Sequence, residues 1–257
     1  MKTHGSVVKR SLAVLRRRFA TLWVAAAWPH IVLAVGCMAI AAFHHLRAQT
    51  GEHADPATLW QSMGGWAKLG VLAIFVVATA LPHGLAVGGV TSVIWKDFQT
   101  GAASLKDVFT GIGRHPGRLV LLSLGLGAFA EIGSVIVIPT VLVIVFCGFA
   151  VPVLIIEKTG TVRSVQRSFA LSGQKIGSIL GLRFATFLFL FLVLIAMSTW
   201  IRALPDMDLQ WWVIPLGFWT ILVLFASLAQ MVEAIVVTQL YIDIQGGRSP
   251  GVDLSGS

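Results

Sequence analysis

Long runs of apolar residues alternate with short polar gaps along the whole chain. A helix needs roughly 20 residues to cross the hydrocarbon core of a membrane, and these runs reach or approach that length. Lipid offers no partner to unpaired backbone groups, so the crossing segments of such a chain are expected to be helices. We therefore predict an all-α, polytopic membrane protein whose six transmembrane helices cover residues 20–43, 69–95, 119–138, 140–156, 178–201 and 211–240.

No polar loop separates the third and fourth of these helices. Residues 119–156 hold one charged residue, Glu131. As one straight helix they would be about 57 Å long, nearly twice the thickness of the hydrocarbon core. The segment must therefore fold back on itself. Gly133, Ser134 and Pro139 form the expected turn, because glycine and proline break helices.

The basic residues favour one side of this arrangement. Of the 19 lysines and arginines, only Arg47, Lys68 and Arg202 fall on one side, and the other 16 fall on the opposite side. The positive-inside rule then predicts that both termini are cytoplasmic in a multi-pass protein of a bacterial-type inner membrane. The same rule explains the net charge of +8 without a nucleic-acid partner.

Composition agrees with a single integral membrane domain over residues 1–257. The chain is 56% hydrophobic and 12% charged, about half the charged fraction of a soluble domain. Cys37 and Cys147 lie inside predicted helices, so no disulfide framework is indicated. Residues 44–66 form the expected outer loop, and residues 244–257 a flexible cytoplasmic tail.

A short basic segment precedes each odd-numbered membrane helix. We expect amphipathic helices at the cytoplasmic membrane surface within residues 1–19, 97–118 and 157–177. Lysine and arginine at such a surface attract anionic lipid at about 1 kcal/mol each. Membrane lipids, anionic on the cytoplasmic face, are therefore the predicted partners, with a membrane protein or a second copy of the chain as further possibilities.

Two of these basic segments carry more specific patterns. Ser104 with Asp107 resembles a capping box at a helix start. In the third segment Arg163 and Arg167 form a basic face beside an apolar stripe of Val162, Val165 and Phe169.

Each even-numbered membrane helix ends in an acidic residue followed by a glycine. The pairs are Asp97 with Gly101, Glu157 with Gly160, and Asp243 with Gly246. We infer three repeats, each with an interfacial helix and a transmembrane hairpin. The acidic residues are expected to pair with basic side chains of those helices, for example Arg167 or Arg114. Internal repeats are common in membrane proteins that move substrates, and they also build inert bundles.

Two segments carry a resemblance to a known family. Residues 152–160 followed by Arg167-Ser168-Phe169-Ala170-Leu171 resemble an E-x-x-G … R-S-x-x-L segment. Tyr241-Ile242-Asp243 with Gly251-Val252-Asp253-Leu254 resembles a Tyr-x-Asp and Gly-x-Asp-Leu tail. Both segments are similar to the membrane domain of glycerophosphoryl diester phosphodiesterases and of its stand-alone six-helix relatives.

This resemblance implies a membrane module without phosphodiesterase activity. The catalytic barrel of that family would need roughly 250 residues, and no segment outside the predicted helices is long enough. Residues 172–176 also lack the tryptophan that family members often place after the Arg-Ser segment. The resemblance adds Ser168 and Tyr241 to the candidate residues at the inner surface, beside Asp97, Glu157, Arg163, Arg167 and Asp243.

Ionisable groups at membrane depth cost a few kcal/mol or more and are candidates for function. The candidate polar path consists of His30, His83, Glu131, Gln230 and Glu233. These groups could move protons or a substrate. Alternatively they hydrogen-bond the helices together, with neutral histidines capping carbonyls freed by the preceding prolines. Zinc is a weaker third interpretation, because the residues lie on four predicted helices without a short ligand motif.

The outer loop offers a second weak metal candidate. It contains His44, His45, Glu52, His53 and Asp55, although a solvated loop that leads into a short helix at Asp55-Pro56 is the favoured interpretation. We predict no metal and no cofactor.

Three functions follow from these patterns. The favoured one is a non-enzymatic integral membrane module that docks lipids or protein partners. The alternative is a small permease or efflux component that uses a polar path between helices. An intramembrane enzyme is least favoured, because no phosphate loop, dinucleotide glycine pattern or nucleophile elbow is present.

Overall fold

The computed structural model describes residues 4–49, 61, 64–134, 145–202 and 213–246. These residues form helices and turns and include no β-strand, so the all-α prediction is confirmed for this part of the chain. The helices are α1 (His4–Gln49), α3 (Gly65–Thr100), α4 (Leu105–Gly113), α5 (Pro116–Ser134), α7 (Ala150–Glu157), α8 (Thr161–Ser172), α9 (Ile176–Arg202) and α10 (Val213–Ile244).

Three helical segments are long and apolar enough to cross a membrane. They are Val7–Ala39 in α1, Ile176–Thr199 in α9 and Val223–Ile244 in α10, and Pro116–Phe129 in α5 is a shorter apolar helix. This finding concerns length and composition within the described residues. It fits membrane association, whereas the count of six crossings stays a prediction.

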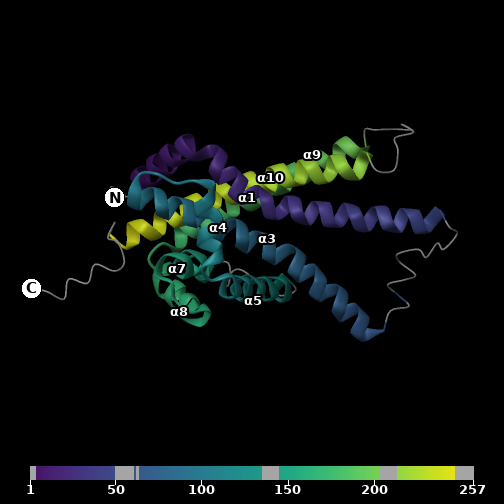
Figure 1. Ribbon diagram of the computed structural model, residues 1–257, viewed down its shortest axis with the longest axis horizontal. Helices are drawn as coiled ribbons and strands as arrows, with labels where there is room; N and C mark the ends of the chain where they lie inside the picture. Colours follow the sequence, from purple (N-terminus) through teal and green to yellow (C-terminus); the bar gives the residue numbers. More distant parts are fainter. Residues whose placement is uncertain (1–3, 50–60, 62–63, 135–144, 203–212, 247–257) are drawn as a thin grey trace, which may run out of the picture.

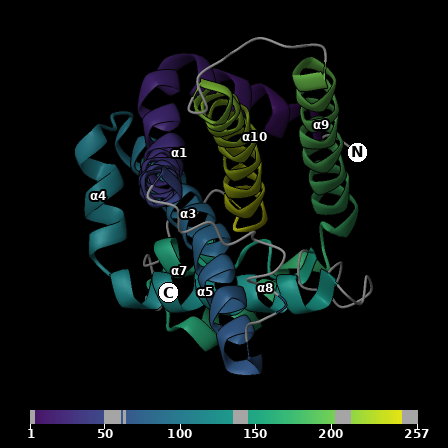
Figure 2. The same ribbon diagram turned by 90° about the vertical axis from the view of Figure 1, so that its right-hand side faces the viewer.

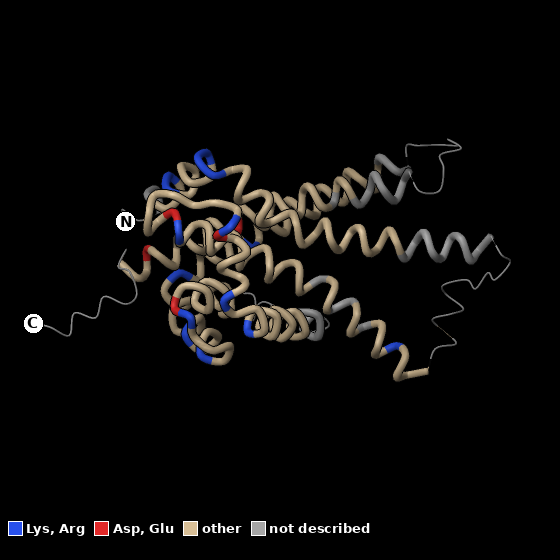
Figure 3. The backbone as a smooth tube through the Cα atoms, viewed as in Figure 1, with Lys and Arg blue, Asp and Glu red and all other residues tan. Residues whose placement is uncertain are grey.

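The long helices α1, α3, α9 and α10 extend away from one compact end of the molecule (Figure 1). Helices α4, α7 and α8 lie at that end, together with the start of α1 and the last turns of α3 and α10. Figure 2 shows α9 beside α10 at one side of the bundle and α4 at the other. Most lysines and arginines of the described residues lie at the compact end (Figure 3), which we call the cationic end.

The first basic segment and the first predicted membrane helix are parts of the single helix α1. Arg18 interrupts this helix with non-helical backbone angles, φ −122° and ψ 19°. Its guanidinium donates to Asp97 Oδ1 at 3.0 Å and to the Gly101 carbonyl at 2.9 Å. These bonds to the end of α3 hold α1 at the point where its direction changes.

The prediction of one uninterrupted helix over residues 140–156 is wrong, because residues 147–149 form a turn. Serines from α8 satisfy the backbone groups that this break leaves free. Ser168 Oγ donates to the Phe146 carbonyl at 2.7 Å and accepts the Phe149 N–H at 3.0 Å. Ser172 Oγ also donates to the Phe146 carbonyl, at 3.2 Å. Gly148 within the turn and Pro152 just after it were the available sequence signals, because glycine and proline break helices. The serines that stabilise the break lie about 20 residues further along the chain.

The turn expected before this segment falls partly outside the described residues. Helix α5 continues through Gly133 and ends at Ser134, whereas Pro139 is not described.

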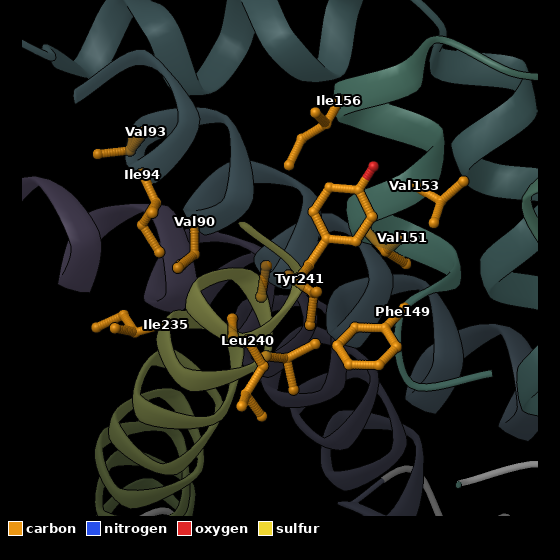
Figure 4. Close-up of a cluster of buried hydrophobic side chains, with 14 of the residues drawn as sticks. Val90, Val93, Ile94, Phe149, Val151, Val153, Ile156, Ile235, Leu240 and Tyr241 are labelled. Atoms are coloured by element: carbon orange, nitrogen blue, oxygen red, sulfur yellow. The ribbon is translucent and has the colours of Figure 1, made fainter. Parts of the chain in front are cut away.

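The buried core lies at the cationic end. Side chains from α3, α7 and α10 meet there around Tyr241 (Figure 4). The ring of Tyr241 packs against Phe149 with centroids 6.3 Å apart. Val90 and Ile94 of α3 contribute from one side and Ile156 of α7 from another. This packing fixes the positions from which the polar side chains of the cationic end project.

Two glycines allow α5 to approach α3 closely. A Cβ added to Gly84 would lie 1.7 Å from Ser123 Oγ, and one added to Gly88 would lie 2.9 Å from a Leu119 methyl carbon. Their G-x-x-x-G spacing therefore serves helix packing.

Candidate functional site

The carboxylate of Asp97 binds two arginines of α1. Asp97 is 4% exposed and forms ion pairs with Arg17 and with Arg18, the latter at 3.0 Å. A buried carboxylate is tolerated only when it is paired and hydrogen-bonded. This cluster therefore joins the bend of α1 to the end of α3.

The carboxylate of Asp243 makes a more exposed contact of the same kind. Its Oδ1 lies 2.7 Å from a guanidinium nitrogen of Arg10. The arginines that pair with Asp97 and with Asp243 therefore all belong to α1. Arg114 of the second basic segment pairs with none of the three acidic residues in the described part of the chain, so the example of Arg114 was wrong. It lines a pocket with Lys96 of α3 and Lys158 at the end of α7, without pairing with Asp97 or Glu157.

Glu157 connects three helices at the end of α7. It accepts a hydrogen bond of 2.7 Å from the Tyr241 hydroxyl and lies 3.5 Å from Arg167 Nε. Gln245 Nε2 donates to the same carboxylate oxygen at 3.4 Å. The two segments that carry the family resemblance therefore meet in space, because Glu157 and Arg167 belong to one and Tyr241 to the other.

Helix α8 buries its serines and exposes its apolar stripe. Ser164, Ser168 and Ser172 are each 0% exposed, whereas Val162 is 71% and Phe169 46% exposed. Ser168 thus acts as a structural contact to the break before α7. Arg163 is exposed and has no ion pair among the described residues. Only Val165 of the predicted stripe packs against the core.

Basic side chains surround a polar pocket of about 200 Å³ between α3, α4 and the end of α7. Lys96 belongs to α3, whereas Arg114 and Lys158 directly follow α4 and α7, and His115 adds an imidazole. The lining also includes the carboxylate of Asp107. That carboxylate accepts hydrogen bonds from the Ser104 N–H at 2.8 Å and the Ser104 hydroxyl at 2.9 Å, so the predicted capping box is present.

A second polar cluster lies deeper in the bundle and includes four of the five predicted path residues. Gln230, the charge of Glu233 and the ring of His30 lie close enough to His83 to act on it. His30 Nδ1 lies 2.9 Å from the Ala26 carbonyl of its own helix. Glu131 belongs to α5, but its side chain lies outside the described residues.

Sequence reasoning missed one member of this cluster, Arg183 of α9. Its guanidinium forms an ion pair with Glu233. Arg183 lies inside the predicted fifth membrane helix, and the sequence analysis counted it only with the surface charges. Its position five residues inside that helix was the available signal, because a cation at that depth needs a partner.

An apolar groove of about 460 Å³ lies between α1 and α3 where the two helices spread apart (Figure 1). Pro29 and Pro82 both line it, beside Trp28 and Leu81. Prolines bend helices because they lack an N–H and clash with the preceding turn.

The described residues contain no group of three or more potential metal ligands. The side chains of His44 and His45, and residues 52, 53 and 55, lie outside the described part.

Comparison of the chain with protein-family models, with curated proteins and with solved structures gave no match.

Proposed function

We propose that this protein is a non-enzymatic integral membrane module of an inner membrane that binds anionic lipid at its cationic end. The observation that carries the proposal is that exposed apolar and exposed basic side chains occur together at the cationic end. The start of α1, helix α4 and helix α8 each contribute side chains of both types. The apolar members are Val8, Leu12, Leu105, Phe109, Val162 and Phe169, all at least 46% exposed.

Exposed cations accompany these apolar side chains. Lys9 belongs to α1, Lys106 to α4 and Arg163 to α8. An amphipathic helix in the membrane interface inserts its apolar side chains between lipids and presents cations to their headgroups. Each cation near an anionic surface contributes about 1 kcal/mol, and salt weakens this attraction.

The proposal includes six membrane crossings in three repeats, with both termini cytoplasmic. Supporting it, the ends of α3, α7 and α10 and the start of α1 all lie at the cationic end (Figure 1). It also includes membership of the six-helix family named above, supported by the contact of Glu157 with Tyr241 and Arg167.

Single cysteines at Lys106 and Arg163, in a variant without Cys37 and Cys147, test the topology. Labelling by an impermeant reagent before the membrane is opened would contradict it.

Lipid preference tests the function directly. The protein is reconstituted in nanodiscs of phosphatidylcholine or phosphatidylglycerol, and the midpoint of thermal unfolding is compared at low and high salt. We expect a higher midpoint in phosphatidylglycerol, and a difference that shrinks with salt. A variant with Lys9→Gln, Lys106→Gln and Arg163→Gln should lose most of this difference. The control Lys9→Arg, Lys106→Arg and Arg163→Lys keeps the charges and should keep the difference.

One observation favours the permease alternative as a second candidate. Within the described residues, the buried Gln230 Oε1 and Arg183 Nε have no hydrogen-bond partner. Unpaired polar atoms beside His83 and Glu233 would suit a passing proton or polar substrate. Proton flux into liposomes, measured for wild type and for Glu233→Gln, tests this idea. Equal flux in both, at the level of empty liposomes, would exclude a proton path.

A further inference from the structure

We propose that the polar pocket between α3, α4 and α7 is a specific binding site for one phosphate-bearing anion. This inference rests on the proposed function and deepens it, because it assigns the headgroup preference of the cationic end to a defined site. A lipid headgroup and a soluble phosphate compound share the chemistry that the pocket would recognise.

The charge of the pocket is unbalanced. Lys96, Arg114 and Lys158 line it, and no carboxylate of the described residues forms an ion pair with any of them. Asp107 is the one acidic side chain in the lining, and Ser104 already donates two hydrogen bonds to it. Three cations against one carboxylate leave a net positive pocket of about 200 Å³.

The backbone at Lys158 adopts a left-handed conformation. Lys158 has φ 56° and ψ 31°, and it is the one non-glycine residue with positive φ in the described part of the chain. This left-handed conformation costs a residue with a Cβ roughly 1–2 kcal/mol, so glycine is the usual choice after a helix end. A lysine there is consistent with a role for its ammonium group in the pocket.

The walls of the pocket are fixed by close helix packing. A Cβ added to Gly111 of α4 would lie 1.9 Å from Ser92 Oγ of α3, so the two helices are in near-backbone contact. Ile156 of α7 is buried in the core behind the pocket. A pre-formed cationic pocket loses little conformational entropy when an anion enters it.

The types of side chain favour phosphate over other anions. A guanidinium can donate two parallel hydrogen bonds to phosphate oxygens, and lysine adds point charges. Leu105 and Phe109 of α4, the helix that ends just before Arg114, are exposed, so the pocket opens where an interfacial helix would meet headgroups. A lipid phosphate and a soluble phosphate can both reach this position.

The test uses the full-length protein and two binding assays. In the first, native mass spectrometry counts phosphatidylglycerol molecules that stay bound after release from nanodiscs of mixed phosphatidylglycerol and phosphatidylcholine. In the second, the detergent-solubilised protein is titrated with inorganic phosphate and binding is followed by calorimetry. The variants are Lys158→Gly and Arg114→Gln, and the control is Arg118→Gln, an exposed arginine of α5 outside the pocket lining.

Lys158→Gly separates binding from folding. It relieves the left-handed conformation, so the unfolding midpoint should stay equal or rise. We nevertheless expect affinity for the anion to fall about tenfold, the effect of losing one charge-assisted hydrogen bond. Arg114→Gln should do the same, and Arg118→Gln should bind as wild type does.

The outcomes separate this inference from the proposed function. Loss of bound phosphatidylglycerol in both pocket variants supports a lipid headgroup as the ligand, and loss of phosphate binding in solution supports a soluble one. If wild type prefers anionic lipid but the pocket variants and Arg118→Gln behave alike in both assays, the pocket site is wrong and the lipid-binding function stands. If wild type shows no preference for phosphatidylglycerol in the nanodiscs, the proposed function fails, whatever the phosphate titration gives.

Discussion

Helices α8 and α9 are neighbours in the chain, but they differ in which side chains they bury. In α8 three serines are fully buried, while Val162 and Phe169 are exposed. In α9 nearly every side chain is apolar, and Phe184, Phe187 and Leu192 are all at least 55% exposed. A polar face turned inward is stable only where backbone groups need partners, as at the break before α7. An apolar face turned outward over the length of α9 suits surroundings of lipid.

The same contrast separates the cationic end from the outer parts of the long helices. At the cationic end, carboxylates, serines and glycines make specific contacts between helices. Further out, as at Gly70 of α3, an added Cβ would meet nothing within 4 Å. Substitutions at the cationic end should therefore cost stability, and matched substitutions further out should not.

The largest effect is expected at Asp97. Asp97→Ala removes the partner of Arg17 and Arg18 and should lower the free energy of unfolding by about 2–3 kcal/mol, the range for hydrogen bonds to charged groups. Both arginines are partly exposed and can turn to solvent, which limits the loss. Thermal unfolding in detergent measures it. The matched variant Asp243→Ala breaks an exposed pair and should cost at most about 1 kcal/mol. Equal losses of unfolding free energy in the two variants would show that burial of the carboxylate does not determine how much these ion pairs stabilise the protein.

A glycine pair on α3 tests the packing difference. Gly84→Ala forces a methyl group into Ser123 and should cost about 2 kcal/mol through overpacking. Gly70→Ala should be neutral or stabilising, because alanine favours helix more than glycine does. The unfolding midpoints of the two variants should therefore move in opposite directions. A loss at Gly70 as large as that at Gly84 would place an unrecognised contact on the outer part of α3.

Ser168→Ala should destabilise by about 1–2 kcal/mol, because it leaves the Phe149 N–H without its partner. Ser172→Ala removes a single longer bond and should cost less. Hydrogen exchange at the Phe149 amide provides a local readout, and it should speed up in the first variant only. Gln166→Ala, at an exposed position of α8, is the control and should leave both measurements unchanged.

The smallest effect concerns pH at the capping box of α4. The hydrogen bond from the Ser104 N–H is the main cause that holds the pKa of Asp107 below its ordinary value, and the Ser104 hydroxyl and the charges of Lys96 and Lys106 act in the same direction. A lowered folded-state pKa stabilises the helix above the unfolded value of about 4, and this contribution is lost as pH falls through the folded pKa. Protection of the α4 amides from hydrogen exchange, taken relative to the intrinsic exchange rate at each pH, should fall below about pH 4. Asp107→Asn should remove this dependence on pH.

The sequence alone determined the features that depend on near neighbours along the chain. Helical periodicity and apolar length predicted the all-α fold, and Ser104 with Asp107 predicted the start of α4, because a capping box is local. The bilayer-depth positions of His83, Gln230 and Glu233 marked them as polar groups in need of partners.

Only the tertiary structure decided which distant groups meet. The pairing of Asp97 with Arg17 joins residues 80 positions apart, and Arg114 was an equally reasonable partner by charge. The break at residues 147–149 depends on serines of α8, and Glu233 depends on Arg183 of the neighbouring α9. Periodicity reports which face of a helix is apolar, whereas the choice among similar partners follows from which helices pack side by side.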